Sequence, residues 1–171
     1  MKNLQLLLCR ALIIANGALF TTASYADSNI QNPVTVETCH SFAWNLEAAK
    51  KGQSDAQYDL AMMYFNGDQV KTDHKSAQHW LNVAAQQNNV KAQYRLAMMA
   101  EMGIGTEKNN TEAFAWYLKA ANQGNAKAQY KVADEYQTGT GIEKDQDQAK
   151  QWFEKAAQQG NTLALAVVQK S

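Results

Sequence analysis

Histidine side chains are the first candidates for chemistry in this chain, because imidazole is a common metal ligand and general base. The sequence has three of them, His40, His74 and His79. A zinc site needs three or four clustered ligands, whereas His74 and His79 are five residues apart, which separates them by about 140° around a helix. We therefore expect the histidines to lie on solvated surface, and we expect no metal or other cofactor.

Catalysis would need a nucleophile beside a base, two carboxylates in different environments, or a metal site. The sequence shows none of these patterns at a spacing that would bring the groups together. We therefore predict no catalytic residues and a protein that is not an enzyme.

Methionine is the other residue type with metal-binding chemistry. Apart from Met1, the methionines fall in two short stretches: Met62, Met63, Met98, Met99 and Met102. Thioethers bind soft ions such as Cu(I), line adaptable apolar grooves, or fill irregular gaps in a core. Core filling is the ordinary use of methionine, and all three interpretations stay open from sequence alone.

The tryptophans indicate which elements carry these residues. They stand 36 residues apart, and a double alanine follows each of them at a fixed distance: Trp44, Trp80, Trp116 and Trp152. A period of this length is typical of stacked helical units, each too small to bury its own apolar face. The sequence therefore predicts an all-α solenoid, in which each tryptophan fills the gap between neighbouring helix pairs.

Each unit is predicted to be a helix, a turn and a second helix. First helices are expected to end at Gly67, Gly103 and Gly139, and second helices to begin after Asp73, Asn109 and Asp145. Glu112 and Gln148 stand three residues after two of these caps, as in a capping box. The predicted repeat domain spans 38–171, with full units at about 52–87, 88–123 and 124–159 and half units at 38–51 and 160–171.

The start of the chain has the features of an export signal. Lys2 is followed by an apolar run from Ala11 to Phe20 and then by small residues up to Ala26. We predict a signal peptide over 1–26, cleaved after Ala26, and a flexible leader over 27–37. Arg10 interrupts the apolar stretch, so no uncharged run is long enough to span a membrane; a retained anchor is the less favoured alternative, and no stable membrane insertion is expected after cleavage. The mature protein is expected to be exported, to the periplasm or beyond it.

Charge and cysteine content limit the partners. The formal net charge is zero, which suggests no stripe for a polyanion, and we expect no nucleic-acid binding. Cleavage would leave Cys39 as the only cysteine, so no internal disulfide is possible. Cys39 is then either a small buried residue or a thiol that reacts between molecules.

Positions that differ between units are free to serve a partner, whereas invariant positions serve the stack. Three such positions lie on the first helices: Asp55, Lys91 and Lys127; Asp59, Arg95 and Lys131; Met62, Met98 and Asp134. If these residues line a groove, its first part is acidic and apolar and its later part is basic, which favours an acidic segment of a partner. The alternative is an ordinary solvated face.

Glycine, A-x-Y-x-L-A, G-x-G, an acidic or Asn cap and A-x-x-W-x-x-x-A-A recur at fixed spacing over 38–171. This pattern resembles the Sel-one-like repeat (SLR), a relative of the tetratricopeptide repeat. The resemblance implies a right-handed α-solenoid whose first helices form a concave groove for a peptide or a folded protein. One departure is Gln69, which stands where later units have the second glycine of G-x-G.

The resemblance therefore implies an exported adaptor or scaffold that binds a protein. A periplasmic immunity protein that neutralises a toxic effector is an alternative within the family. A further alternative is a β-lactam-binding or hydrolysing relative, but that branch carries cysteine pairs that this chain lacks. The apolar last helix, with Leu163, Leu165, Val167 and Val168, also suggests self-association as a hypothesis.

Overall fold

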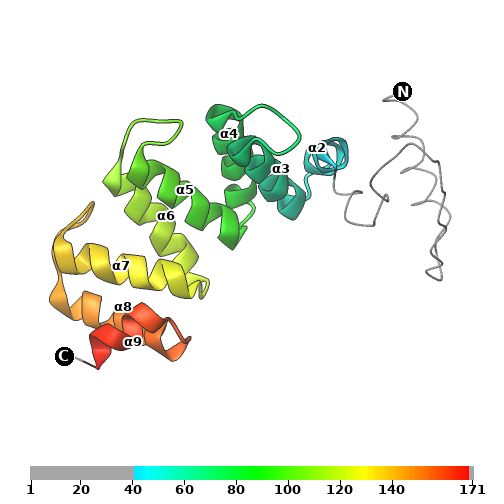
Figure 1. The fold of residues 1–171 in the computed structure, drawn as a ribbon. Coiled ribbons are helices and arrows are strands. Elements are labelled where there is room, and N and C mark those ends of the chain that lie inside the picture. The colour runs from blue at the N-terminus through cyan, green and yellow to red at the C-terminus, as the bar shows by residue number, and fades with distance from the viewer. Residues whose placement is uncertain (1–40, 170–171) are drawn as a thin grey trace, which may run out of the picture.

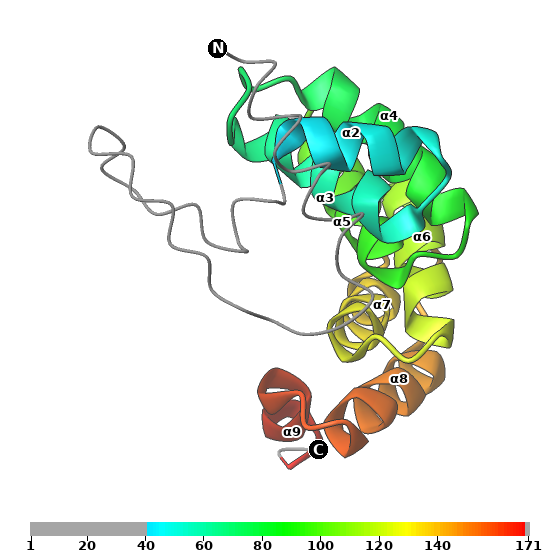
Figure 2. The same cartoon turned by 90° about the vertical axis from the view of Figure 1, so that its right-hand side faces the viewer.

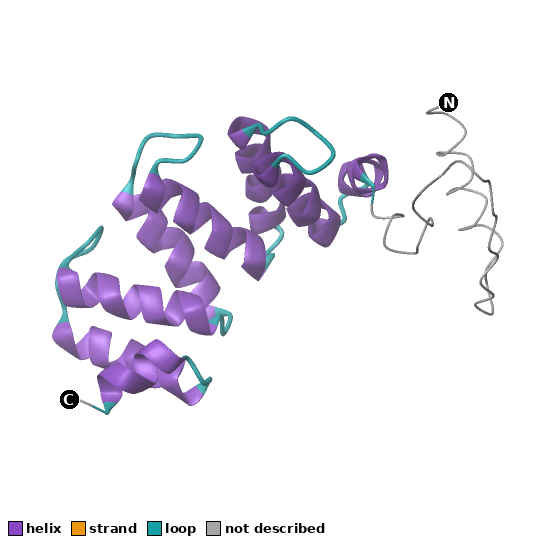
Figure 3. Ribbon diagram, in the orientation of Figure 1, coloured by secondary structure: helices purple, strands orange, loops and turns teal. Residues whose placement is uncertain are grey.

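The computed structural model describes residues 41–169. The predicted signal peptide and leader, Ala26, Cys39 and His40 lie outside the described residues. Within the described range the chain forms eight helices and no strand (Figure 3). They are α2 (Phe42–Lys50), α3 (Ser54–Asn66), α4 (His74–Gln86), α5 (Val90–Met102), α6 (Asn110–Asn122), α7 (Ala126–Thr138), α8 (Gln146–Gln158) and α9 (Thr162–Val168).

The helices stack in chain order into a curved array (Figure 1). Each first helix packs on the second helix of its own unit, in the pairs α3 with α4, α5 with α6 and α7 with α8, and each pair contacts the next. Figure 2 shows α3, α5, α7 and α9 along the inner side of the arc and α4, α6 and α8 along its outer side. The all-α solenoid and its unit of 36 residues are confirmed.

The helix ends follow from local chemistry. Asp73, Asn109 and Asp145 are the N-caps of α4, α6 and α8, and each side chain accepts hydrogen bonds from N–H groups of the first turn. Gly67, Gly103 and Gly139 are the C-caps of α3, α5 and α7, with φ angles of 81°, 70° and 80°. Such left-handed angles are costly for residues with a Cβ, which explains the recurring glycine.

The capping-box prediction is only half right. Asn109 and Asp145 accept from the backbone N–H of Glu112 and Gln148, as expected. Their own N–H groups, however, donate to carbonyl oxygens at the end of the preceding helix, over 2.9 Å. A backbone bond thus joins the first and second helices of a unit, and it occupies the N-cap N–H group that the Glu112 or Gln148 side chain would accept from in a capping box.

The tryptophans are less uniform than predicted. Trp152 is only 7% exposed, but Trp44 is 37% exposed, so the prediction that every tryptophan fills a gap is wrong for Trp44. The reason is its place on α2, which packs mainly against α3 at the start of the described array. On the outer side, Lys119 and Lys155 lie 4.0 Å from the ring centroids of Trp116 and Trp152, so these lysines cover the rings as well as facing solvent.

A buried glutamine connects each unit to the unit before it. Gln57, Gln93 and Gln129 are at most 5% exposed and occupy the same repeat position. Gln93 donates to the carbonyl oxygen of Ala85 on α4 over 3.2 Å and accepts from Gln123, after α6, over 2.7 Å. The other two make the same pair of bonds, so one buried amide satisfies groups from three consecutive helices.

We expect Gln93→Leu to lower the free energy of unfolding by about 1–3 kcal/mol, because it removes the side-chain donor to the Ala85 carbonyl and leaves the Gln123 amide without its acceptor. The measurement is the urea midpoint of the variant against the parent, followed by far-ultraviolet circular dichroism. Gln86→Leu, at an exposed position on α4, is the control and is expected to change little. Equal midpoints for Gln93→Leu and the parent would show that the bridge does not stabilise the stack.

Gln69 keeps the turn that glycine forms in the other units. Its φ angle is 63°, close to the 76° of Gly105 and Gly141. Its side-chain oxygen accepts from the backbone N–H of Phe42 over 3.1 Å, at the start of α2. In the repeat, α2 begins about one turn later than α4 and α6. The space that this missing turn would occupy holds the Gln69 side chain, which satisfies a first-turn N–H group of α2.

Candidate functional site

The inner face carries a basic depression, which we call the cationic hollow. It has a volume of about 390 Å³ and lies where α3, α5 and the start of α7 meet. Its lining residues are Tyr58, Lys91, Tyr94, Arg95, Asn125, Ala126 and Lys127. Among these described residues there are three cations and no carboxylate. The hollow therefore attracts negative charge.

Aromatic rings support two of these cations. Lys91 Nζ lies 5.9 Å from the ring centroid of Tyr58, and the guanidinium carbon of Arg95 lies 5.7 Å from that of Phe65. A cation over a ring face is attracted by the ring quadrupole, which favours a defined position for its long side chain. The rings thus come from α3, and the cations from α5, so two units contribute to one hollow.

A second depression, the apolar hollow, adjoins the first. Its volume is about 490 Å³, and more of its lining is apolar. The lining residues are Tyr94, Ala126, Lys127, Tyr130, Lys131, Gln159, Gly160, Asn161, Thr162 and Leu163. Leu163, on α9, is 59% exposed. Tyr94, Ala126 and Lys127 line both hollows, which are therefore continuous.

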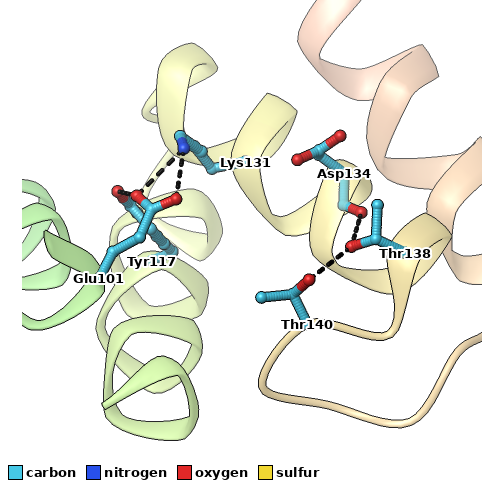
Figure 4. A network of polar contacts seen from close by, with 6 residues as sticks. All are labelled: Glu101, Tyr117, Lys131, Asp134, Thr138 and Thr140. Carbon is cyan, nitrogen blue, oxygen red and sulfur yellow. Dashed lines mark hydrogen bonds and ion pairs between the residues drawn. The ribbon is translucent and has the colours of Figure 1, made fainter. Parts of the chain in front are cut away.

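Lys131 is held in an ion pair beside the apolar hollow. Its Nζ contacts the two carboxylate oxygens of Glu101 at 2.7 and 3.0 Å, and the Tyr117 hydroxyl donates to Glu101 over 2.7 Å (Figure 4). Partial burial alone would raise the pKa of Glu101, but the bonds from Lys131 and Tyr117 outweigh it and lower that pKa. Lys131 therefore presents a neutralised charge, unlike the cations of the other hollow.

Glu135 lies on α7, one turn after Lys131, and is only 3% exposed. Both of its carboxylate oxygens are buried without a hydrogen-bond partner. Burial, with the charge of Glu101 nearby, raises its pKa to about 8. The same repeat position is Met63 in the first unit and Met99 in the second, both buried in the core. A carboxyl group has thus replaced a core methionine in the third unit.

The nine predicted groove residues are not all in one place. Lys91, Arg95 and Lys127 meet in the cationic hollow, and Lys127 and Lys131 line the apolar hollow. The other five predicted groove residues line neither hollow: Asp55, Asp59, Met62, Met98 and Asp134.

Contacts account for several of the residues outside the hollows. Asp55 accepts a hydrogen bond from Asn89 over 3.0 Å. Met98 packs against the core, and the backbone oxygen of Asp134 accepts from Thr138 over 2.9 Å (Figure 4). Met63 and Met99 are buried in the core, which favours core filling for one methionine of each adjacent pair, while Met102 is 57% exposed.

The tyrosines of the inner face were not among the predicted groove residues. Tyr58, Tyr94 and Tyr130 recur in every unit, which is typical of residues that serve the stack, yet all three are half-buried and line the hollows. Leu163 was predicted only as one of the apolar residues of the last helix that suggest self-association. Leu163 occupies the repeat position of Asp55, Lys91 and Lys127, and that change from charge to apolar character was the available signal.

His74 corrects the prediction of a solvated histidine. It is half-buried, its ring centroid lies 5.2 Å from that of Phe65, and its Nδ1 is buried. Over residues 41–169, no three side chains of His, Cys, Asp or Glu are grouped closely enough to hold a metal ion. None of the helices in that range has the length and apolar character that crossing a bilayer requires.

Comparison with known proteins agrees with this architecture. Residues 54–89, 90–125 and 126–161 each match the family model described as Sel1 repeat. A Sel1 repeat protein from Oxalobacter formigenes is 38% identical, with a TM-score of 0.71, over 74% of this chain and 96% of that one. No significant match to a curated protein was found.

Two further solved structures are similar. A protective antigen present in uropathogenic Escherichia coli strains, which displays an SLR fold, is 34% identical with a TM-score of 0.73. The similarity covers 74% of this chain and 27% of that one. Cysteine rich protein B of Helicobacter pylori, at 20% identity and a TM-score of 0.61 over 78% of this chain and 98% of that one, shares the fold.

Proposed function

Because the chain belongs to the Sel1 repeat family, we propose that it is an exported adaptor that holds a protein partner on the inner face of its first helices. Sel1 repeat proteins are generally modules of protein–protein interaction and are typically not enzymes. The stacked units offer a long surface whose shape is fixed by packing, which suits recognition of another chain.

The cationic hollow is the observation that supports this proposal most directly. Lys91, Arg95 and Lys127 come from two consecutive units and converge on one depression without a lining carboxylate among the described residues. Opposite charges steer a partner to its site and exclude wrong partners. We propose that the hollow receives an acidic segment of the partner.

Export is proposed from the first 26 residues, whose charge, apolar run and small residues before Ala26 are typical of a signal peptide. The periplasm is the favoured compartment in this proposal. It is tested by N-terminal sequencing of the protein recovered from the cell envelope, where a new terminus at Asp27 is expected. A terminus at Met1 in that fraction would overturn it.

We expect Arg95→Glu to abolish capture of a partner from the envelope fraction of the native cell, because it reverses one of the three charges in the hollow. The bait is the purified protein on a resin, and the readout is mass spectrometry of the retained proteins. Lys150→Glu makes the same charge change at an exposed position on the outer helix α8 and is expected to capture as the parent does.

The supporting result is a protein retained by the parent and by Lys150→Glu but lost by Arg95→Glu, with the same helical circular dichroism for all three. Equal capture by Arg95→Glu and the parent would remove the cationic hollow from the binding site. Retention of no protein by the parent would contradict the adaptor proposal itself.

A further inference from the structure

The two hollows form one continuous surface with two kinds of chemistry. Both are lined by Tyr94 and Lys127, and the boundary between them runs along α5 and α7. On one side of it lie Lys91 and Arg95 with their charges, and on the other side lie Tyr130 and Leu163. A ligand that fills both hollows must therefore carry a charged group and an apolar group close together.

The apolar hollow is less basic than its lysines suggest. The Lys131 charge is compensated by Glu101 at 2.7 Å, so Lys127, at the boundary, is the lysine of this hollow whose charge a ligand can compensate. Tyr130 is fixed by its contact with Phe153, whose ring centroid lies 5.6 Å away. Leu163 provides apolar surface at a position where the preceding units have Lys91 and Lys127. Burial of an apolar side chain here is favourable.

We propose that the hollows together bind one extended segment of a partner protein, in which an acidic residue is followed or preceded at short range by a large apolar residue. The carboxylate lies among Lys91, Arg95 and Lys127, and the apolar side chain lies against Tyr130 and Leu163. This inference rests on the proposed function, since it specifies the partner's chemistry at the same inner face.

The spacing of the helices sets the spacing within the segment. The two hollows share Tyr94, Ala126 and Lys127, so their centres are separated by about one helix diameter, roughly 10 Å, and an extended chain advances about 3.3 Å per residue. One step from the cationic hollow to the apolar hollow therefore corresponds to about three residues. An acidic and an apolar residue separated by two to four positions match both hollows at once.

The test uses fluorescein-labelled synthetic peptides of ten residues in a Gly/Ser background, with fluorescence anisotropy on the purified protein. One peptide carries Glu and Phe three positions apart, a second has Ser in place of Phe, and a third has Ser in place of Glu. We expect the first to bind at least about tenfold more tightly than either of the others, since each hollow contributes separately.

Two variants test which hollow binds which side chain of the peptide. Arg95→Glu is expected to remove the preference for Glu and keep part of the preference for Phe. Leu163→Ser is expected to remove the preference for Phe and keep that for Glu. Since Leu163 is 59% exposed, this substitution is not expected to disturb folding, which circular dichroism checks. Lys150→Glu again serves as the control on the outer face.

Other outcomes separate this inference from the proposed function. If the Glu peptide binds equally with and without Phe, the apolar hollow is not part of the site, and the inference fails while the adaptor proposal stands. If no peptide binds although Arg95-dependent capture from the envelope succeeds, the partner presents a folded surface and the inference is again overturned. If light scattering shows a dimer that Leu163→Ser dissociates, a second copy occupies the apolar hollow instead.

Discussion

Glu135→Met is expected to make the protein more stable at neutral pH, and the gain is expected to grow with pH. Methionine is the residue at this position in the two preceding units, where Met63 and Met99 are buried. The substitution removes a buried carboxyl group whose two oxygens have no hydrogen-bond partner. An unsatisfied buried polar group costs about 1–3 kcal/mol, and an apolar side chain of similar shape should recover about that much.

The pH dependence follows from the pKa of Glu135, which is about 8 in the folded protein against an ordinary value of 4.5. The folded state therefore holds a proton that the unfolded state releases. The contribution of this protonation to the free energy of unfolding is fully present below pH 4.5 and is lost as the pH rises to about 8. Between pH 5 and pH 8, the gain from Glu135→Met should thus widen by roughly 3–4 kcal/mol, and it should level off above that.

Within residues 41–169, four ionisable groups interact electrostatically with Glu135. They are Glu101 on α5, Tyr117 on α6, and Lys131 and Asp134 on α7 itself. The pKa of Glu101 is lowered and that of Lys131 raised, so both changes lie outside the window from pH 5 to pH 8. Urea unfolding at pH 5, 6, 7 and 8 measures the effect, with Glu143→Gln in an exposed loop as control. Parallel profiles for Glu135→Met and the parent would contradict the prediction.

Gly141→Ala is expected to destabilise the protein by about 3 kcal/mol, because two costs add. The φ angle of Gly141 is 76°, which is unfavourable for any residue with a Cβ. A Cβ at this position would also overlap the carbonyl oxygen of Asn110, at the start of α6. The loop after α7 and the preceding second helix cannot both keep their positions, so we expect a lower thermal midpoint.

Gly124→Ala is the matched control, because it has the first cost without the second. Its φ angle is 89°, and a Cβ there meets no atom within 4 Å. It should lower stability by only about 1–2 kcal/mol. Thermal unfolding of the two variants side by side gives the cost of the contact itself. If both variants melt at the same temperature, the close approach of Gly141 to Asn110 carries no energetic weight.

Much of the fold was predictable because its determinants are local. An Asp or Asn cap acts on N–H groups two or three residues away, and a terminal glycine acts at its own φ angle, so the helices could be placed from sequence. The repeat register also placed Lys91 and Lys127 on successive inner helices. Their convergence in one hollow follows from that register together with the stacking of the units, which places the first helices in order along the inner side of the arc.

The remaining features depend on contacts between side chains that differ from unit to unit. The charge of Lys131 is neutralised by Glu101, but the other units have Phe65 and Gln137 at the repeat position of Glu101. The repeat pattern therefore does not predict this ion pair. The burial of Glu135 was readable from Met63 and Met99, although its unsatisfied oxygens were not. The burial of Trp44 was overestimated, because the repeat pattern was applied to a helix with fewer neighbours.

The glutamine bridges also determine how such an array can be lengthened. Since Gln57, Gln93 and Gln129 each join three consecutive helices, a duplicated block of 36 residues or a multiple of 36 brings its own complete set of bonds, and blocks of other lengths do not. At the far end, Leu165 occupies the position of these glutamines. A designed array with one more unit after α9 would therefore require Leu165→Gln first, whereas copies inserted before α9 would need no such change.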